Sequence, residues 1–125
     1  MIGTHKVYCL CGSTRFKREF EEQAKWLTLS GNIVLMPNVW CHDSAFIERS
    51  ITKDMKERLD ELHLRKIDMA DVVFIINPEN YIGESTKNEI KYALQKGKEI
   101  MFEYDYAIKT KDGKPRIDIL LSEIQ

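Results

Sequence analysis

Short apolar runs alternate along the chain with longer segments in which apolar residues recur every three or four positions. The short runs predict strands and the longer segments predict helices, because side chains repeat every two residues in a strand and every 3.6 in a helix. The predicted strands are residues 6–10, 33–36, 72–76 and 100–104. The predicted helices are residues 17–30, 52–70 and 84–96.

Each predicted helix carries an apolar stripe and a plausible end. Gly31 and Gly97 follow two of the helices as stop residues, and Thr52 is a suitable N-cap for the third, with Asp54 in its first turn. The inward stripe of the first helix is Phe16, Phe20, Ala24 and Leu27. The second stripe is Met55, Leu59, Leu62, Ile67 and Ala70, and the third is Ile90, Ala93 and Leu94.

The alternation of strand and helix predicts an α/β fold. Residues 72–76 are apolar at successive positions, which is typical of a strand covered on both faces. We therefore expect a small doubly wound (flavodoxin-like or Rossmann-like) three-layer sandwich with a mostly parallel sheet of about five strands and right-handed crossovers. The chain, 1–125, is expected to be a single domain. Residues 38–52 are expected to be irregular, and 105–125 are compatible with a last strand, a short helix or a C-terminal arm.

The composition argues against two classes of binding partner, nucleic-acid polymers and anionic membranes. With 43% apolar residues, 31% charged residues and a net charge of -1, the chain reads as an ordinary soluble protein rather than one that binds a nucleic-acid polymer or an anionic membrane. Residues 1–6 lack the apolar core of a signal peptide, and no apolar run approaches the ~20 residues of a membrane span. We expect a cytoplasmic protein.

The three cysteines point to a reducing compartment, since an odd number does not form a disulfide framework. Cys9 and Cys11 have no second cysteine pair and few histidines nearby in the sequence, so we expect no metal site. The P-loop and the dinucleotide-binding fingerprint are both absent, and we expect no cofactor.

In a parallel α/β sheet, ligands bind beyond the carboxyl ends of the strands. The first loop there carries Cys11, Gly12, Ser13, Thr14 and Arg15. A glycine that admits close backbone approach, a helix start and several donors suit an anionic ligand. A plain strand-to-helix turn capped by the serine explains the same residues equally well.

The second loop carries Trp40, His42, Asp43 and Phe46. Aromatic rings beside polar groups suit a flat heterocycle. By sequence alone, a hydrophobic plug with a solvated rim is the favoured interpretation.

The third loop carries Gly83, Ser85 and Thr86, and Glu89 follows in the helix. A carboxylate near a helix N-terminus should have a lowered pKa and stay ionised, which suits a nucleophile. The competing interpretation is a capping box with Thr86 as N-cap and Glu89 three residues on, and the motif alone favours it.

His63 shares the inward face of its helix with Leu59 and Ile67. Such a histidine is usually a core residue, and it becomes functional only if that face borders the same cleft as Glu89. The charged residues around it are expected to form a solvated face with i,i+4 pairs: Asp60, Glu61, Arg65, Lys66 and Asp68.

Taken together, the three loops resemble the nucleoside 2-deoxyribosyltransferase superfamily, which includes 2'-deoxynucleoside 5'-monophosphate N-hydrolases. The resemblance runs from Val7 to about Tyr104. It is carried by a strand ending in Cys-Gly-Ser at 11–13, the run Ala-Asp-Val-Val-Phe-Ile-Ile at 70–76, and Gly-Glu-Ser-Thr-x-x-Glu-Ile-x-Tyr-Ala at 83–93.

The resemblance implies that Glu89 attacks the anomeric carbon of a nucleoside or nucleotide and forms a glycosyl-enzyme, which water or a second base resolves. The first loop would hold sugar or phosphate, and the second would cover the base. The resemblance also implies a homodimer or larger homo-oligomer, with 105–125 available to complete a neighbouring site.

The chain departs from the family where an aspartate is expected, seven residues before Ala70, because His63 stands there. A histidine can act as acid or donate a hydrogen bond to the sugar. The departure also motivates an alternative function, a non-catalytic nucleotide-binding protein that acts as a sensor or sequesters its ligand.

Overall fold

The computed structural model describes residues 5–40 and 44–104. Within them, four strands form one sheet in the order β2-β1-β3-β4, and every neighbouring pair is parallel. The strands are β1 (Val7–Cys11), β2 (Ile33–Leu35), β3 (Val72–Ile75) and β4 (Glu99–Phe102). The predicted α/β doubly wound fold is confirmed, with four parallel strands in place of about five.

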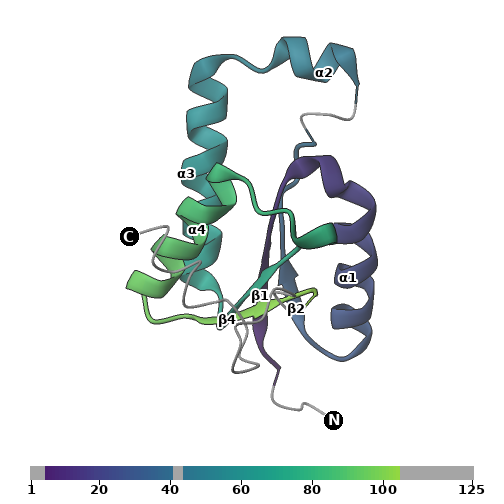
Figure 1. Ribbon diagram of the computed structural model, residues 1–125, viewed down its shortest axis with the longest axis vertical. Helices are drawn as coiled ribbons and strands as arrows, with labels where there is room; N and C mark the ends of the chain where they lie inside the picture. The colour runs from purple at the N-terminus through teal and green to yellow at the C-terminus, as the bar shows by residue number, and fades with distance from the viewer. Residues whose placement is uncertain (1–4, 41–43, 105–125) are drawn as a thin grey trace, which may run out of the picture.

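Helices cover both faces of the sheet and give the molecule three layers (Figure 1). α1 (Lys17–Leu29) covers one face, and α3 (Lys53–Met69) and α4 (Glu84–Gln95) cover the other. Three short helices lie in the loops: η1 (Thr14–Phe16), α2 (Ala45–Ser50) and η2 (Pro78–Asn80). No helix within the described ranges is long and apolar enough to cross a membrane.

The face covered by α1 is built from alternate strand residues. Leu10, Phe74 and Ile76 pack against Phe20, which is fully buried. The whole predicted stripe of this helix joins the same cluster. Each buried side chain of this size stabilises the fold by about 1.5–3 kcal/mol relative to exposure.

The other face is packed by the intervening residues of the same strands, because successive strand side chains point to opposite sides. Cys9 and Cys11 of β1 lie here with Ile67 of α3 and with Ile90 and Ala93 of α4. β3 contributes to both faces, which explains why its residues are apolar at successive positions and are all buried.

The predicted stripe of α3 holds only at its carboxyl end. Ile67 and Ala70 are buried, whereas Met55 and Leu62 are 47% and 50% exposed. The amino-terminal half of the helix extends past the carboxyl ends of the strands, where it has no sheet to pack against (Figure 1). On α4, Leu94 was likewise expected to face inward but is 39% exposed.

Helix ends follow local chemistry closely. Thr52 caps α3 as predicted, with Met55 N donating to its Oγ1 at 3.1 Å. Gly31 and Gly97 adopt φ of 92° and 71°, as expected of stop residues. The prediction that 38–52 is irregular missed α2, which Ser44 caps by accepting a hydrogen bond from Ile47 N at 3.1 Å. Residues 105–125, for which strand, helix and arm were left open, lie outside the described part of the chain.

Candidate functional site

The sheet places a crevice between β1 and β3. The chain passes from β1 to β2 on one side and then crosses to β3 on the other, so the loops that leave these two strands diverge. A cleft of about 720 Å³ lies there, lined by the loops after β1, β2 and β3 and by residues of α3 and α4. The strand order therefore explains why three loops that are distant in sequence share one cavity.

The first and third loops supply most of the predicted binding residues to this cleft. Six of them line it: Gly12, Ser13, Thr14, Gly83, Ser85 and Thr86. Ser13 also accepts a hydrogen bond from Arg15 N at 3.4 Å, which confirms the capped-turn interpretation of this loop, while its role in binding stays a prediction.

Gly12 is needed for packing between the two loops. A Cβ at this position would lie 2.7 Å from the carbonyl oxygen of Ile76, which follows β3. The sequence suggested close approach to a ligand, but the backbone that approaches Gly12 is the protein's own. The absence of a side chain at Gly12 therefore allows the loop after β1 to lie directly against the end of β3.

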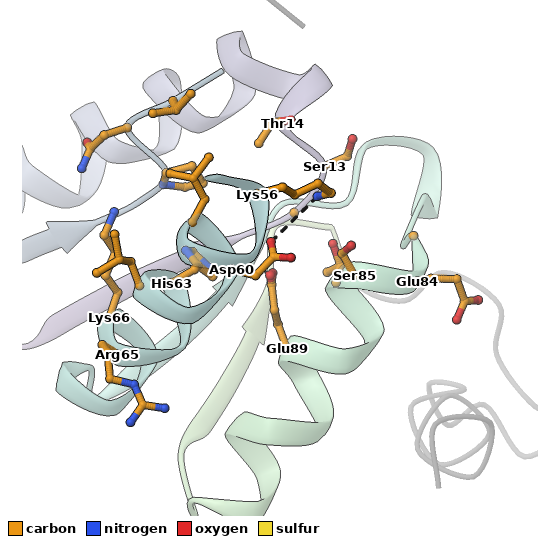
Figure 2. A pocket seen from close by; sticks show the side chains of 18 of the residues that line it. Ser13, Thr14, Lys56, Asp60, His63, Arg65, Lys66, Glu84, Ser85 and Glu89 are labelled. Carbon is orange, nitrogen blue, oxygen red and sulfur yellow. Dashed lines mark ion pairs between the residues drawn. The ribbon is translucent and has the colours of Figure 1, made fainter. Parts of the chain in front are cut away.

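Glu89 and His63 face one another across the cleft. Glu89 Oε1 lies 3.7 Å from His63 Nε2, and their side chains are 18% and 11% exposed. Packing of α3 against α4 brings them together (Figure 2). The condition set for a functional histidine, a face bordering the same cleft as Glu89, is met.

The expectation of a lowered pKa for Glu89 is wrong. Burial raises its pKa to about 7, with Cys9 and Asp60 adding to the increase and His63 and Lys56 opposing it. α4 begins at Glu84 behind Gly83 as N-cap, so Glu89 lies in the second turn, past the free N–H groups that would stabilise its charge.

The capping-box interpretation of Thr86 and Glu89 is also wrong. Thr86 lies inside α4 and is 3% exposed, and the N-cap, Gly83, makes no side-chain capping bond. Glu89 is therefore not held by a local cap, and its carboxylate is directed to the cleft.

Two thiols lie behind the imidazole. His63 Nε2 is 3.1 Å from Cys11 Sγ and 3.9 Å from Cys9 Sγ, and both cysteines are fully buried. The pKa of Cys9 is lowered to about 6, mainly by its hydrogen bond with Cys11 and also by His63. Burial acts in the opposite direction and raises it. Cys11 was predicted to touch the ligand, but it is not among the cleft-lining residues.

Burial alone would lower the pKa of His63. The hydrogen bond with Cys9 and the charge of Glu89 outweigh burial, so the net effect is a raised pKa. The imidazolium form is therefore favoured by the groups on both of its sides.

Three charged residues of α3 that were expected to form a solvated face line the cleft, namely Asp60, Arg65 and Lys66, and so does Lys56, which the sequence did not single out. Lys56 and Asp60, about two turns and one turn before His63, form an ion pair at 3.9 Å. Figure 2 shows Asp60, His63 and Glu89 directed to the same part of the cleft. Lys66 lines it too and donates to the carbonyl oxygen of Met36 at 2.8 Å. Spacing of three residues (Asp60 and Lys66) and of seven residues (Lys56) from His63 could have identified them.

The i,i+4 pairing expected for that face does occur, and it involves Arg65, which also lines the cleft. Arg65 Nε lies 3.4 Å from Glu61 Oε1, and the same guanidinium lies 3.1 Å from Asp68. These pairs are exposed and contribute little to stability.

Arg15 and Trp40 are placed away from the lining of the cleft. The Arg15 guanidinium stacks on the ring of Tyr81, 4.7 Å from its centroid, and Tyr81 lines the cleft instead. Trp40 packs edge-on against Phe20 at 5.2 Å, in agreement with the hydrophobic-plug interpretation of its loop. His42 and Asp43 lie outside the described residues.

Comparison of the chain with protein-family models, with curated proteins and with solved structures gave no match. What the cleft can do is therefore argued from its own residues. The carboxyl group of Glu89 and the imidazole of His63 are both nearly buried and both have raised pKa values, about 7 for Glu89, so the two groups can exchange protons and Glu89 can attack an electrophile once it is ionised.

Proposed function

We propose that the cleft cleaves or transfers the N-glycosidic bond of a nucleoside or nucleotide, with Glu89 as nucleophile and His63 as acid. The observation that carries the proposal is the opposition of these two side chains, 3.7 Å apart, in a cleft of about 720 Å³. The resemblance of the sequence to nucleoside 2-deoxyribosyltransferases supplies the substrate class.

In the first step, a carboxylate oxygen of Glu89 forms a bond to the anomeric carbon as the carbon–nitrogen bond breaks. The base leaves with the bonding electron pair, and the His63 imidazolium gives it a proton. In the second step, water or another base attacks the same carbon and releases the carboxylate. Two displacements at one carbon give retention of configuration.

The distance between the two groups sets a requirement. The catalytic pair of retaining glycosidases is about 5 Å apart, which leaves room for the sugar. Because Glu89 and His63 are closer than this, one of the two side chains must rotate when the sugar enters.

Polar groups around the pair suit the rest of the substrate. Ser13 and Thr14 place hydroxyl groups on the wall formed by the first loop. Lys56 contributes a cation from α3, and the ion pair that it forms with the exposed carboxylate of Asp60 is long, at 3.9 Å. A phosphate on the sugar could therefore bind between the Lys56 ammonium and the hydroxyl groups of Ser13 and Thr14 without disrupting a strong ion pair.

The test is release of free base from a panel of nucleosides and nucleotides, followed by mass spectrometry of the nucleotide pool. Glu89→Gln should abolish release, because an amide cannot attack the anomeric carbon. Glu61→Gln is the control. It removes an exposed carboxylate of α3, and base release should be unchanged. Full turnover by Glu89→Gln would exclude the mechanism.

A nucleotide-binding protein without catalysis is the second candidate. It is favoured by the raised pKa of Glu89, which leaves a large neutral fraction at pH 7, and by His63 where the resembling family has an aspartate. In that case a nucleotide raises the melting temperature of the chain and is recovered intact after hours.

A further inference from the structure

Two thiols and an imidazole meet at one point beneath the cleft. Cys9 and Cys11 are two residues apart on β1, so their side chains point to the same face of the sheet, and His63 reaches them from α3. The two sulfur atoms and one ring nitrogen all lie within 4.8 Å of one another. The sequence did not predict this cluster, because His63 is 52 residues from Cys11 along the chain.

We propose that Cys9, Cys11 and His63 bind a zinc ion whose fourth coordination position opens toward the cleft. Thiolate and imidazole are the ligands that zinc prefers, and three protein ligands with one open position are typical of a reactive zinc site. The site goes beyond the N-glycosidic chemistry proposed above, and zinc binding does not depend on that proposal.

The spacing of the ligand atoms matches a tetrahedral ion. With Zn–S bonds of about 2.3 Å and Zn–N bonds of about 2.0–2.1 Å, a tetrahedral angle separates sulfur from nitrogen by about 3.5 Å. The two observed sulfur–nitrogen distances, 3.1 Å and 3.9 Å, lie on either side of that value. Each sulfur–nitrogen distance is therefore within about half an ångström of the tetrahedral value. The two sulfur atoms lie within 4.8 Å of one another, and rotation of the cysteine side chains would bring them to the separation of about 3.8 Å that a tetrahedral ion requires.

The ion has a route in and a polar group near its open position. Both sulfur atoms are inaccessible from outside, but the His63 side chain lines the cleft and is 11% exposed. Glu89 Oε1 lies 3.7 Å from the coordinating nitrogen, so a water on the fourth position would lie within reach of this carboxyl group.

Zinc binding and glycosidic cleavage would compete, because both use Nε2 of His63. An imidazole whose nitrogen holds the ion cannot protonate a leaving base through it. This consequence alone rests on the proposed function, and it predicts that zinc inhibits base release and that a chelator restores it.

The test uses the full chain, reduced and freed of metal, titrated with Co²⁺ as a spectroscopic probe and then with Zn²⁺. We expect one equivalent of Co²⁺, a thiolate-to-cobalt charge-transfer band in the near ultraviolet and tetrahedral d–d bands, all displaced by Zn²⁺. Cys9→Ser and Cys11→Ser should each weaken the charge-transfer band by about half and lower affinity at least tenfold, ~1.4 kcal/mol. Cys41→Ser, which removes the third cysteine, should change neither.

Absence of the charge-transfer band in the native chain would overturn the zinc site, and so would a band that persists in both serine variants or disappears in Cys41→Ser. Because serine at a buried position can destabilise the fold, the circular-dichroism melt of each variant is compared with that of the native chain. His63→Asn keeps both thiols and should also weaken cobalt binding at least tenfold. If the metal-free chain releases no base but forms the cobalt band, only the glycosidase is excluded; if the metal-free chain releases base but forms no cobalt band, only the metal site is excluded.

Discussion

Glu89 on α4 and His63 on α3 lie 3.7 Å apart, carboxyl oxygen to ring nitrogen, although 26 positions separate them in the chain. Their approach depends on the packing of two helices against the same face of the sheet. Burial raises the pKa of Glu89 to about 7, whereas the pKa of His63 is raised by Cys9 and Glu89 against the effect of burial. Several expected outcomes can be derived from this pair and from the contacts that support it.

The first prediction concerns the pH dependence of base release. Attack requires ionised Glu89, whose pKa is raised to about 7, so kcat/KM should rise as pH increases through that value. Asp60 raises this pKa and Lys56 lowers it. Asp60→Asn should therefore move the acid limb to lower pH and Lys56→Gln to higher pH, each by about 0.2–0.7 of a pH unit for partly exposed charges. Shifts in the same direction for both variants would contradict this electrostatic account.

The second prediction concerns stability and has the opposite sign from that of an ordinary surface carboxylate. The pKa of Glu89 is about 7 in the folded chain against 4.5 for the free side chain, so the folded state holds the proton more tightly. The stabilisation from this group is complete below pH ~4.5 and is lost as pH rises through ~7. Removing the buried charge by Glu89→Gln should stabilise the fold by about 2–3 kcal/mol at pH 8 and by little at pH 4. Urea unfolding at the two pH values measures this difference, and Glu61→Gln is the exposed control.

The third prediction tests the contact between the two loops of the crevice. Gly12→Ala would place a Cβ 2.7 Å from the Ile76 carbonyl oxygen, and backbone must shift to relieve it. The expected loss of stability is about 1–3 kcal/mol. Gly83→Ala is the comparison: its Cβ would be 3.4 Å from the Tyr81 hydroxyl, an ordinary contact, so its cost should be only the about 0.5–1 kcal/mol of replacing the glycine N-cap of α4 by alanine. Chemical denaturation measures the unfolding free energy of both variants. Equal losses would contradict the claim that a side chain at position 12 is excluded by Ile76.

The fourth prediction concerns Asn77, which is fully buried at the end of β3. Its Nδ2 donates to the carbonyl oxygen of Tyr104 and its Oδ1 accepts from Tyr104 N, both at 3.0 Å. Asn77→Ala would leave two backbone groups without these partners and should cost about 2–4 kcal/mol of unfolding free energy. Asn88→Ala changes an exposed residue of α4 and should stay within about 0.5 kcal/mol.

Local sequence predicted the elements of this fold well where the helix or strand pattern coincided with a cap. Thr52 and the two stop glycines marked helix ends correctly, because capping and φ > 0 depend on a few neighbouring residues. α2 was missed although Ser44 caps it, since a helix of six residues is too short to show a period.

The stripe of α3 shows the limit of this reasoning. The helical spacing of apolar residues predicts that Met55, Leu62 and Ile67 are all buried, but only Ile67 is buried. Burial depends on where the strands end, and no local pattern records that position.

By itself, the sequence determined the strand-and-helix order, the parallel sheet and the loops that lie at its carboxyl edge, because period, caps and connection lengths are local properties. It also singled out Glu89 and His63 as candidates. Only the tertiary structure decided that Glu89 is buried with a pKa of about 7, opposite to the shift expected from a helix terminus. Only the fold, likewise, brought Cys9 and Cys11 to His63. Dielectric environment and the meeting of distant side chains depend on how elements pack, which a linear pattern does not contain.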